Sequence, residues 1–561
     1  MKERKNYGEK TAAWREYESS IQYNRQIGFY SAIQKNEQYY RGDQWAGVNK
    51  GNLVDTPVFN IIERITQHLV SSVVAQQISI SYSADVLPVM GDTVFAEELR
   101  LATEVMKRHA DYRWEASKMD SLFRQSLIDA ALSGDGVFYT YWDPKIKTGT
   151  AFKGDFVTEC IDSSRLHVCD TNSSDIQSQK YIIISGRQEV SELKREAKDN
   201  GVPKVEYETI AGDTDTLNEA STLGAIENQD PSAAKATYII KFYRNDEGYV
   251  CWQKSTQSVV IRQEETQLTL YPVALFSWKK TKNSYRGTSP ITPIIDNQKF
   301  INKSYALAMK HMIDTAFSKI IYDKALIPEW SNEVGEAIGV RGGGDVSKAV
   351  SAVGVGTMQP NFFNVVGNVD AMTKETLGAT DAALGEVRPE NTSAILALQE
   401  ASAVPLELVR QNAYQGIEDL ANIWADFMLA YYHDGRAVIF VGANGLEAQE
   451  IDFSQYADSL IHAKVDVGAS TKYTEAALVQ MLNNMLYGGF IDTVTYLKYI
   501  PSNVLPQKDS IIADLTAAQQ AQAAAQAQAQ TTEQGIGPGG YPAYTNQLNV
   551  PQSPTAALNL K

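Results

Sequence analysis

The segment from Ser289 to Met428 places the strongest constraint on what this chain can fold into. Apolar side chains recur at helical spacing from Ile291 to Met312, and again from Leu408 to Met428. Between these two stripes lies an insert that contains the glycine-rich stretch 339–356. A first helix of about 22 residues would span roughly 33 Å at about 1.5 Å per residue. We therefore expect a long helical element built into the chain, a design suited to mechanical assembly.

Shorter elements are expected within this segment. The sequence predicts strands at 317–322 and 361–366, a short helix that opens at Pro328, and a helix over 369–384. Gly385 should end the latter, because glycine readily takes the left-handed conformation found at helix C-termini. Helix should restart at Thr392 or Ser393, and Pro405 then lies inside an otherwise helical pattern and lacks a backbone donor, so a kink is expected there.

The residues before Ser289 indicate an α+β body. Helical periodicity covers 1–40, 58–77, 93–133 and 190–198, and Asn60 followed by Glu63 resembles a capping box. Alternating, β-branched and aromatic runs predict strands at 78–82, 137–142, 152–160, 166–168, 181–184, 238–243, 249–254, 259–263 and 273–279. Ser133-Gly-Asp-Gly136 should stop a helix, and Asp143-Pro144 should turn the chain. The acidic stretch 210–236 is expected to be a mobile loop.

The C-terminal part is expected to be mainly helical. Strands are predicted at 436–441 and 464–468, followed by helices over 471–500 with a break at Gly488-Gly489. Residues 516–532 are almost wholly Ala and Gln, which favours helix, and 534–561 have the composition of a disordered tail.

Composition limits the partners that the chain can have. The 561 residues suffice for two to four domains, and the formal net charge is −16. Because Lys and Arg supply most of the affinity for duplex DNA, such a chain would not grip DNA through a broad basic groove. The three cysteines (Cys160, Cys169 and Cys251) suit a reducing compartment and are expected to be buried small side chains. Neither a secretory signal nor an apolar run of membrane-spanning length is found, so we expect no membrane partner.

The usual patterns of catalytic and ligand-binding sites are missing from the sequence. Gly339-x4-Gly344 is followed by Asp345-Val346 where a phosphate-binding loop needs Lys and Ser or Thr. Cys160, His167 and Cys169 lack the paired spacing of a zinc site. The six histidines are scattered, and paired-carboxylate chemistry stays possible without support. We therefore expect no catalytic residues, no metal and no cofactor.

Several motifs, taken in order, resemble the portal proteins of tailed bacteriophages. An aromatic turn spans 39–45, a helix opening follows at 57–62, and a glycine-punctuated strand entry lies at 133–138. Tyr285-Arg-Gly-Thr-Ser-Pro290 precedes the first long helix, which begins with Asn297, Gln298 and Asn302. Each motif is weak alone, but their order and spacing over about residues 20–500 make the resemblance specific.

The resemblance implies a fold and its parts. These are an α/β wing of N-terminal helices and a mixed sheet (1–287), a first stem helix (288–315), a small α/β clip (316–366) and a second stem helix (367–385). A tunnel loop (386–391), a kinked helix that returns to the wing (392–469), a helical crown (470–532) and a disordered tail (533–561) would follow.

The resemblance also implies a function. The chain would form a homo-oligomeric, usually dodecameric ring at one capsid vertex, through which double-stranded DNA is packaged and ejected. Its partners would be the terminase large subunit, the head–tail adaptor, and the major capsid and scaffolding proteins, with assembly in the host cytoplasm. A separate motor would drive packaging, so the chain itself would not be an enzyme, and a like-charged lumen would let DNA slide.

Three groups of residues follow as candidate sites. The tunnel loop would place its residues in the DNA channel: Glu386, Val387, Arg388, Pro389, Glu390 and Asn391. Lys299, Lys303 and Lys310 on the first stem helix are candidates to face DNA, with solvated faces or inter-subunit salt bridges as the alternative. Trp330, Phe362 and Phe363 are candidates for the clip interface, with plain clip core as the alternative. The competing functions are another virion connector or scaffold-associated protein and, less favoured, an unrecognised hydrolase.

Overall fold

The structure is a computed structural model of the chain. It describes residues 10–47, 49–50, 56–74, 78–84, 93–149, 152–213, 234–316, 320–331, 338–342, 345, 347, 349–352, 358–359, 361–379, 404–433, 435–442, 445–457, 459, 461–467, 472–500, 505, 508, 511–512 and 515. The chain divides into two compact units, Met1–Thr471 and Lys472–Lys561, which are described separately.

The first unit begins with a series of helices. They are α1 (Ala12–Gln26), α2 (Phe29–Tyr40), α3 (Ile61–Val74), α4 (Thr93–Ala116) and α5 (Met119–Ser133). The last three contribute buried side chains to a central apolar core. The core itself centres on Trp424, which lies within 5.4 Å of the Phe156 ring and donates to the Thr158 hydroxyl at 2.9 Å. Asn60 and Glu63 bond to each other at the start of α3, which confirms the predicted capping interaction.

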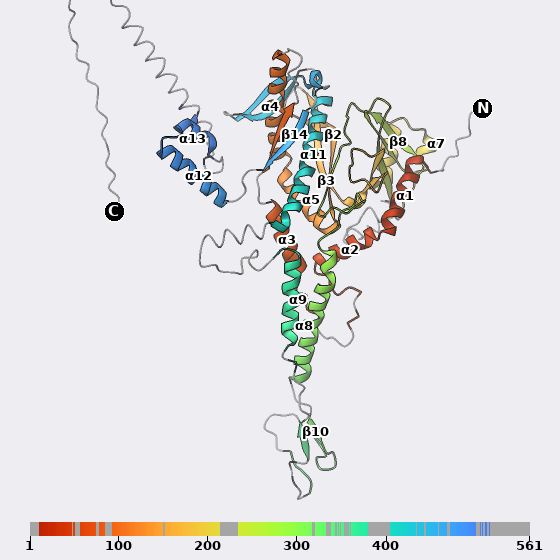
Figure 1. Cartoon of the computed structure of the whole chain (residues 1–561). Coiled ribbons are helices and arrows are strands. Elements are labelled where there is room, and N and C mark those ends of the chain that lie inside the picture. The colour runs from red at the N-terminus through yellow and green to blue at the C-terminus, as the bar shows by residue number, and fades with distance from the viewer. Residues whose placement is uncertain are drawn as a thin grey trace, which may run out of the picture. The chain divides into compact units, whose positions relative to one another are not determined.

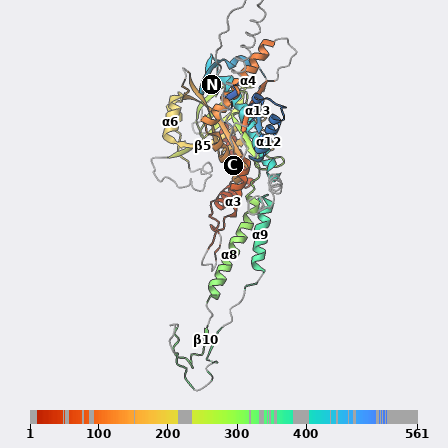
Figure 2. The ribbon, with the colours of Figure 1, turned by 90° about the vertical axis from the view of Figure 1, so that its left-hand side faces the viewer.

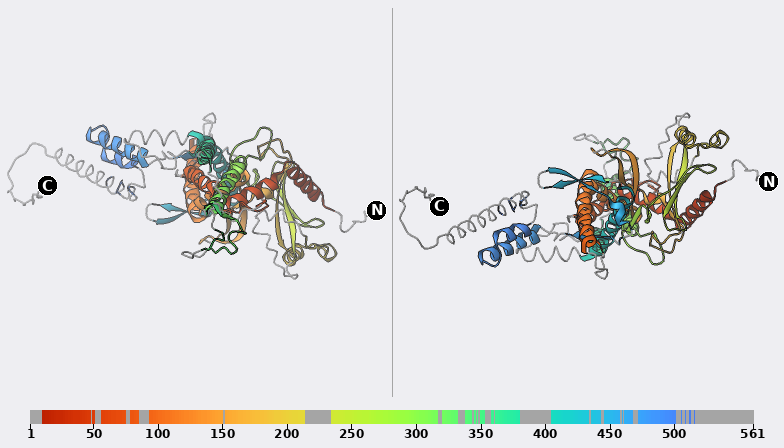
Figure 3. Two further views of the ribbon diagram at one scale, coloured as in Figure 1. Left: turned by 90° about the horizontal axis from the view of Figure 1, so that it is seen from below. Right: turned by 90° about the horizontal axis from the view of Figure 1, so that it is seen from above.

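Two antiparallel sheets contain most of the strand residues of this unit (Figure 1). One has the strand order β3 (Lys153–Ile161), β2 (Asp135–Lys147), β9 (Val273–Ser277). The other has the order β4 (Leu166–Val168), β5 (Tyr181–Glu189), β6 (Lys235–Arg244), β7 (Val250–Ser255), β8 (Val260–Glu265). α6 (Val190–Asp199) and α7 (Lys204–Tyr207) follow β5, and α1 lies along the larger sheet (Figure 3).

Three short two-stranded sheets complete the strands of the first unit. β1 (Ile78–Ala84) pairs with β14 (Ile461–Val467), β10 (Ile320–Tyr322) with β11 (Val350–Ala352), and β12 (Arg436–Gly442) with β13 (Gly445–Ile451). All strand pairs among the described residues are antiparallel, so the mixed sheet expected for residues 1–287 is wrong. The α+β class is confirmed.

The long helical element is present as predicted, with different boundaries. α8 (Ile295–Thr315) and α9 (Phe362–Thr376) lie side by side (Figures 1 and 2), and α11 (Glu407–Tyr431) packs on β9 and β14. The strand predicted at 361–366 is wrong, because Phe362–Val366 form the first turns of α9. The second helix also ends at Thr376 instead of near Leu384. Gly378, two residues after this end, adopts a left-handed φ of 71°.

Other predicted elements are wrong for local reasons. Asp143-Pro144 does not turn the chain, because β2 continues past it through an irregularity in its pairing with β3. Pro328–Ser331 are not helical. Pro405 lies in a single 3-10 turn (Val404–Leu406) directly before α11, and residues 380–403, where the predicted kinked helix begins, lie outside the described residues, so the kink stays a prediction. Cys169 is exposed instead of buried.

The second unit contains α12 (Lys472–Tyr487) and α13 (Thr493–Tyr499) among its described residues. Gly489 between them has a φ of 71°, which confirms the predicted break. Residues 214–233 of the predicted loop 210–236, Gly385, the stretch 516–532 and the tail 533–561 lie outside the described residues, whereas Lys235 and Ala236 belong to β6 instead of the loop.

Two glycine motifs, whose Gly134 and Gly287 are 153 residues apart in sequence, cross where the chain leaves the sheets for α8. A Cβ atom on Gly134 would lie 2.6 Å from the carbonyl oxygen of Gly287, and one on Gly287 would lie 2.5 Å from that of Gly134. Both distances are too short for any side chain. Gly134 also ends α5 with a φ of 103°. Ser133-Gly-Asp-Gly136 and Tyr285-Arg-Gly-Thr-Ser289 therefore form one backbone junction.

A buried ion pair holds this junction together. Asp135 is fully buried and accepts hydrogen bonds from the Gly287 amide at 2.7 Å and the Ser277 hydroxyl at 2.8 Å. The Arg286 guanidinium lies 3.7 Å from Asp135 and donates to the carbonyl oxygens of Ser163 and Leu166 at 2.8 Å each. The Phe29 and Tyr285 rings flank this guanidinium at 4.1 and 4.4 Å. Burial raises the pKa of Asp135, and Arg286 opposes that rise.

Replacing Arg286 with methionine should lower the free energy of unfolding by about 3–5 kcal/mol, because it leaves an unpaired buried carboxylate. The loss should be smaller at pH 5 than at pH 8. The native pKa of Asp135 is raised above its unfolded value, so the native state binds more protons and stability falls as pH rises. Without Arg286, which opposes that rise, the pKa of Asp135 is higher still, so the stability of the variant falls more steeply with pH than that of the unaltered chain. Urea denaturation at both pH values measures this. The Asp135→Asn/Arg286→Met double variant should lose less than the single variant, and Arg100→Met, in an exposed pair, should lose nothing measurable.

Candidate subunit-interface and channel site

A network of side-chain amides fixes the N-terminal turns of α8 to the segment before α3. Gln298 donates to the Phe59 carbonyl at 2.6 Å and accepts from the Ile61 amide at 3.1 Å. One turn further on, Asn302 accepts from the Phe59 amide at 3.2 Å. The two helix residues thus bond to an extended segment in the way that a neighbouring strand would. They fix the position of α8 along that segment.

The network continues away from α8 and carries no charge in its centre. Asn302 donates to the Gln44 side chain at 2.6 Å, and Gln44 donates to Asn60 at 2.9 Å. Gln44 also donates to the Tyr39 carbonyl at 2.9 Å. Because Gln298, Asn302 and Gln44 are each at most 2 % exposed, removing one partner would leave the others buried without a bond. The aromatic turn at 39–45 and the helix opening at 57–62 meet here.

α9 packs against α8 through few but specific contacts. The Asn297 side chain donates to the Thr373 hydroxyl at 3.0 Å, and Val366 and Thr373 are the buried residues of α9. Two turns further toward the C-terminus of α8, the Tyr305 ring lies between the rings of Phe59 and Phe363, at centroid distances of 4.4 and 6.4 Å. These contacts fix which sides of the two helices face each other.

The three candidate lysines of α8 lie on one stripe, because they follow one another at spacings of four and seven residues. Two of them pair with acids on the same helix: Lys299 with Asp296 at 2.9 Å and Lys310 with Asp314 at 2.7 Å. Lys303 is exposed, and none of the carboxylates in the described ranges forms an ion pair with it. Lys303 therefore has the ammonium group that is most available to a phosphate.

Both helices of the pair also expose large apolar side chains. On α8, Phe300 is 42 % and Leu307 is 54 % exposed, and on α9, Val365 is 51 % and Met372 is 66 % exposed. In each pair the two residues are seven positions apart, which places them on one stripe. The sequence pattern did not single out these stripes, because its periodicity follows Ile291, Ile294, Ile295, Ile301, Tyr305, Met309 and Met312. Of these, the first four are buried and Met312 is 59 % exposed.

The candidate clip residues lie in two different places. Trp330 stacks on Tyr322 of β10, with ring centroids 5.3 Å apart. Phe362 and Phe363 contact each other edge to face at 5.4 Å in the first turn of α9, where Phe363 is 50 % exposed. They belong to the helix pair, so the structure separates them from Trp330. The tunnel-loop candidates Glu386–Asn391 lie outside the described residues.

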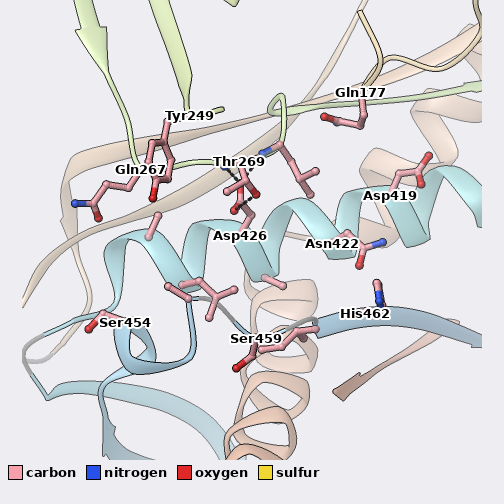
Figure 4. Close-up of a pocket in the computed structure, with 16 residues that line it drawn as sticks. Gln177, Tyr249, Gln267, Thr269, Asp419, Asn422, Asp426, Ser454, Ser459 and His462 are labelled. Atoms are coloured by element: carbon pink, nitrogen blue, oxygen red, sulfur yellow. Dashed lines mark hydrogen bonds between the residues drawn. The ribbon is translucent and has the colours of Figure 1, made fainter. Parts of the chain in front are cut away.

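A hollow of about 780 Å³ lies along α11 (Figure 4), and its lining residues belong to neither α8 nor α9. Its carboxylate Asp426 accepts three hydrogen bonds of 2.9 Å from Thr269 and Leu270 and so holds the loop between β8 and β9. Asn422 accepts from the Ala463 amide at 2.8 Å. Burial raises the pKa of Asp419, which accepts from Gln415. The polar groups with these contacts serve to position loops and the strand β14.

Buried histidines have structural partners as well. His167 bonds to the hydroxyls of Ser20 and Ser185 at 3.2 Å each, and burial lowers its pKa to about 3. His109 bonds to the Ile439 carbonyl at 2.7 Å and to Tyr432 at 3.0 Å, and burial lowers its pKa to about 4. Both are therefore neutral links between elements. Within the described part of the chain, no group of three or more His, Cys, Asp or Glu residues is arranged to hold a metal.

Of the helices that the structure describes, none combines the length and the apolar character that crossing a membrane requires.

Comparison with known proteins gives the family of the chain. A search of curated proteins found no match. A family model described as "Phage SU10 portal protein" matches residues 102–535, which is more than half of the chain and contains α8, α9 and α11, and confirms the resemblance to phage portals. The chain therefore belongs to the SU10 phage portal protein family, whose members are structural, non-enzymatic components of the capsid vertex.

Proposed function

We propose that the chain assembles into a homo-oligomeric ring, twelve subunits being the usual number for portals, and that the ring forms a channel for double-stranded DNA. The observation that carries this proposal is the exposed apolar surface on both α8 and α9. Together Phe300, Leu307, Val365 and Met372 would leave much apolar area in water in a monomer, and contact with another subunit would remove it. The family adds the expectation of a ring at the capsid vertex.

The parts of the chain receive roles within this proposal. Residues up to 287 act as the wing, α8 and α9 as the stem, and the segment between them, 316–361, as the clip that docks the terminase large subunit and later the head–tail adaptor. Residues 386–391 act as the tunnel loop, α11 returns the chain to the wing, and 470–532 act as the crown. The major capsid and scaffolding proteins would surround the wing during assembly in the host cytoplasm.

The stem would contact DNA weakly. A ring of chains that each carry −16 repels phosphates overall, so the duplex would slide instead of binding tightly. Lys303 supports a transient contact, since its ammonium group is exposed and unlike Lys310 is not drawn to a carboxylate on the same helix. Such a contact would be independent of base sequence.

The purified full-length chain should form rings with a central hole in negative-stain images, and native mass spectrometry should give one dominant multiple of 62.0 kDa. Leu307→Asp/Met372→Asp should shift the population to monomers that keep the helical content of the unaltered chain in circular dichroism, because both side chains are exposed in the monomer. A monodisperse monomer of the unaltered chain would contradict the proposal.

Lys303→Gln should weaken the binding of a short duplex to the ring. The dependence of log affinity on log salt should become less steep by about one for each phosphate that the ring no longer neutralises. Lys310→Gln is the matched control and should have a smaller effect, because Lys310 already pairs with Asp314. Fluorescence anisotropy at several salt concentrations measures both variants. Equal effects of the two changes would argue against a DNA contact at Lys303.

Deleting residues 386–391 should leave ring assembly intact and reduce the amount of DNA packaged or retained, since a tunnel loop acts on DNA and not on subunit contacts. Native mass spectrometry and a DNase-protection assay of packaged DNA test the two expectations separately. If the deletion prevents folding, the tunnel-loop assignment is wrong.

A further inference from the structure

The arrangement of side chains on the α8–α9 pair shows how neighbouring subunits would meet. Successive residues of a helix are rotated by about 100°. On α8, Asn297 points toward α9, as its bond to Thr373 shows. Phe300 and Leu307 then point roughly 60–80° to one side of that direction, and Tyr305 points roughly 80° to the other side.

The same reasoning applies to α9, where Thr373 points toward α8. Val365 and Met372 point roughly 80–100° to one side of that direction, and Phe363 points roughly 80° to the other. The rings of Tyr305 and Phe363 are 6.4 Å apart, so these two residues share a side of the helix pair. The opposite side then carries the exposed residues of both helices.

The pair thus has two apolar faces that point in opposite directions. The first face consists of Phe300, Leu307, Val365 and Met372. The second face consists of Tyr305, Phe363 and Phe59, whose ring lies 4.4 Å from Tyr305. Phe59 and Phe363 are 45 % and 50 % exposed. Two different faces on opposite sides match a head-to-tail contact, which closes into a ring, whereas one self-complementary face would give a two-fold dimer.

The charges beside these faces do not oppose such a contact. Asp296 pairs with Lys299, Asp314 with Lys310, and Asp370 with Lys374 at 3.2 Å, each within its own helix. These paired charges add no isolated charge to the contact. Lys303, three residues after Phe300 and four before Leu307, lies at the edge of the first face and is the unpaired charge beside it among the described residues.

We propose that the first face of one subunit packs against the second face of the next copy of this chain. This inference rests on the proposed ring and adds its contact residues and its direction. The lysine stripe points away from α9, because Lys299 follows Asn297 by two residues, or roughly 200°. With both apolar faces covered by neighbours, Lys299, Lys303 and Lys310 lie on a radial face of the ring, and Glu375 lies on the opposite radial face of α9.

Disulfide cross-linking tests the contact. Leu307 and Phe363 lie at the same height along the axis of the antiparallel helix pair. Leu307 follows Asn297 by ten residues on α8, Phe363 precedes Thr373 by ten residues on α9, and Asn297 bonds to Thr373. Leu307→Cys/Phe363→Cys, in a Cys169→Ser background that removes the exposed native thiol, should give a reducible ladder of covalent multimers after mild oxidation. Both positions are exposed, so folding should be retained.

Matched variants decide between the possible outcomes. Leu307→Cys/Asn364→Cys should give no ladder, because exposed Asn364 lies next to Phe363 at nearly the same height but points roughly 180° from Thr373, away from both neighbours. Rings that form without cross-linking in the first variant, an equal ladder in this control, or covalent dimers of Leu307→Cys alone would each overturn the proposed contact while leaving the ring intact. Absence of rings in the Cys169→Ser background would instead overturn the proposed function, and the contact with it.

Discussion

The buried pair of Asp135 and Arg286, at the crossing of two glycine motifs, is the interaction on which the rest of the structure depends. It joins the end of α5, the edge of the smaller sheet and the chain that enters α8, and Arg286 extends it to the start of β4 through two carbonyl oxygens. A charge with no water around it needs its partner, so the junction has one arrangement. That arrangement sets the direction in which α8 leaves the sheets.

The amide network below this junction has a complementary role. Gln298 and Asn302 bond to the backbone of Phe59 and Ile61, so α8 cannot slide along or rotate about its axis without breaking several buried bonds. The rotation of α8 in turn decides that Phe300 and Leu307 point to one side and the lysine stripe to another. In a portal, the same polar contacts that stabilise the fold would thereby orient the surfaces used for assembly and for DNA.

Much of the fold could be predicted from local patterns. The α+β class, the break at Gly488-Gly489, the capping pair of Asn60 and Glu63, and most strands follow from periodicity and from residues with special backbone preferences. The errors arose where a pattern was ambiguous. The run Phe362–Val366 is apolar enough for a strand, but it forms the start of α9, where Val366 is buried and Phe363 and Val365 are exposed.

The sequence by itself determined the family, the elements and the presence of two glycine motifs, because backbone preferences and motif order are local properties. Only the tertiary structure decided that Gly134 meets Gly287 and that Lys303, unlike Lys299 and Lys310, has no paired acid among the described residues. It also decided that Phe300 stays exposed while Ile301 is buried. These outcomes depend on residues far away along the chain, such as Phe59 and Thr373, and burial is fixed by the neighbours that folding brings together.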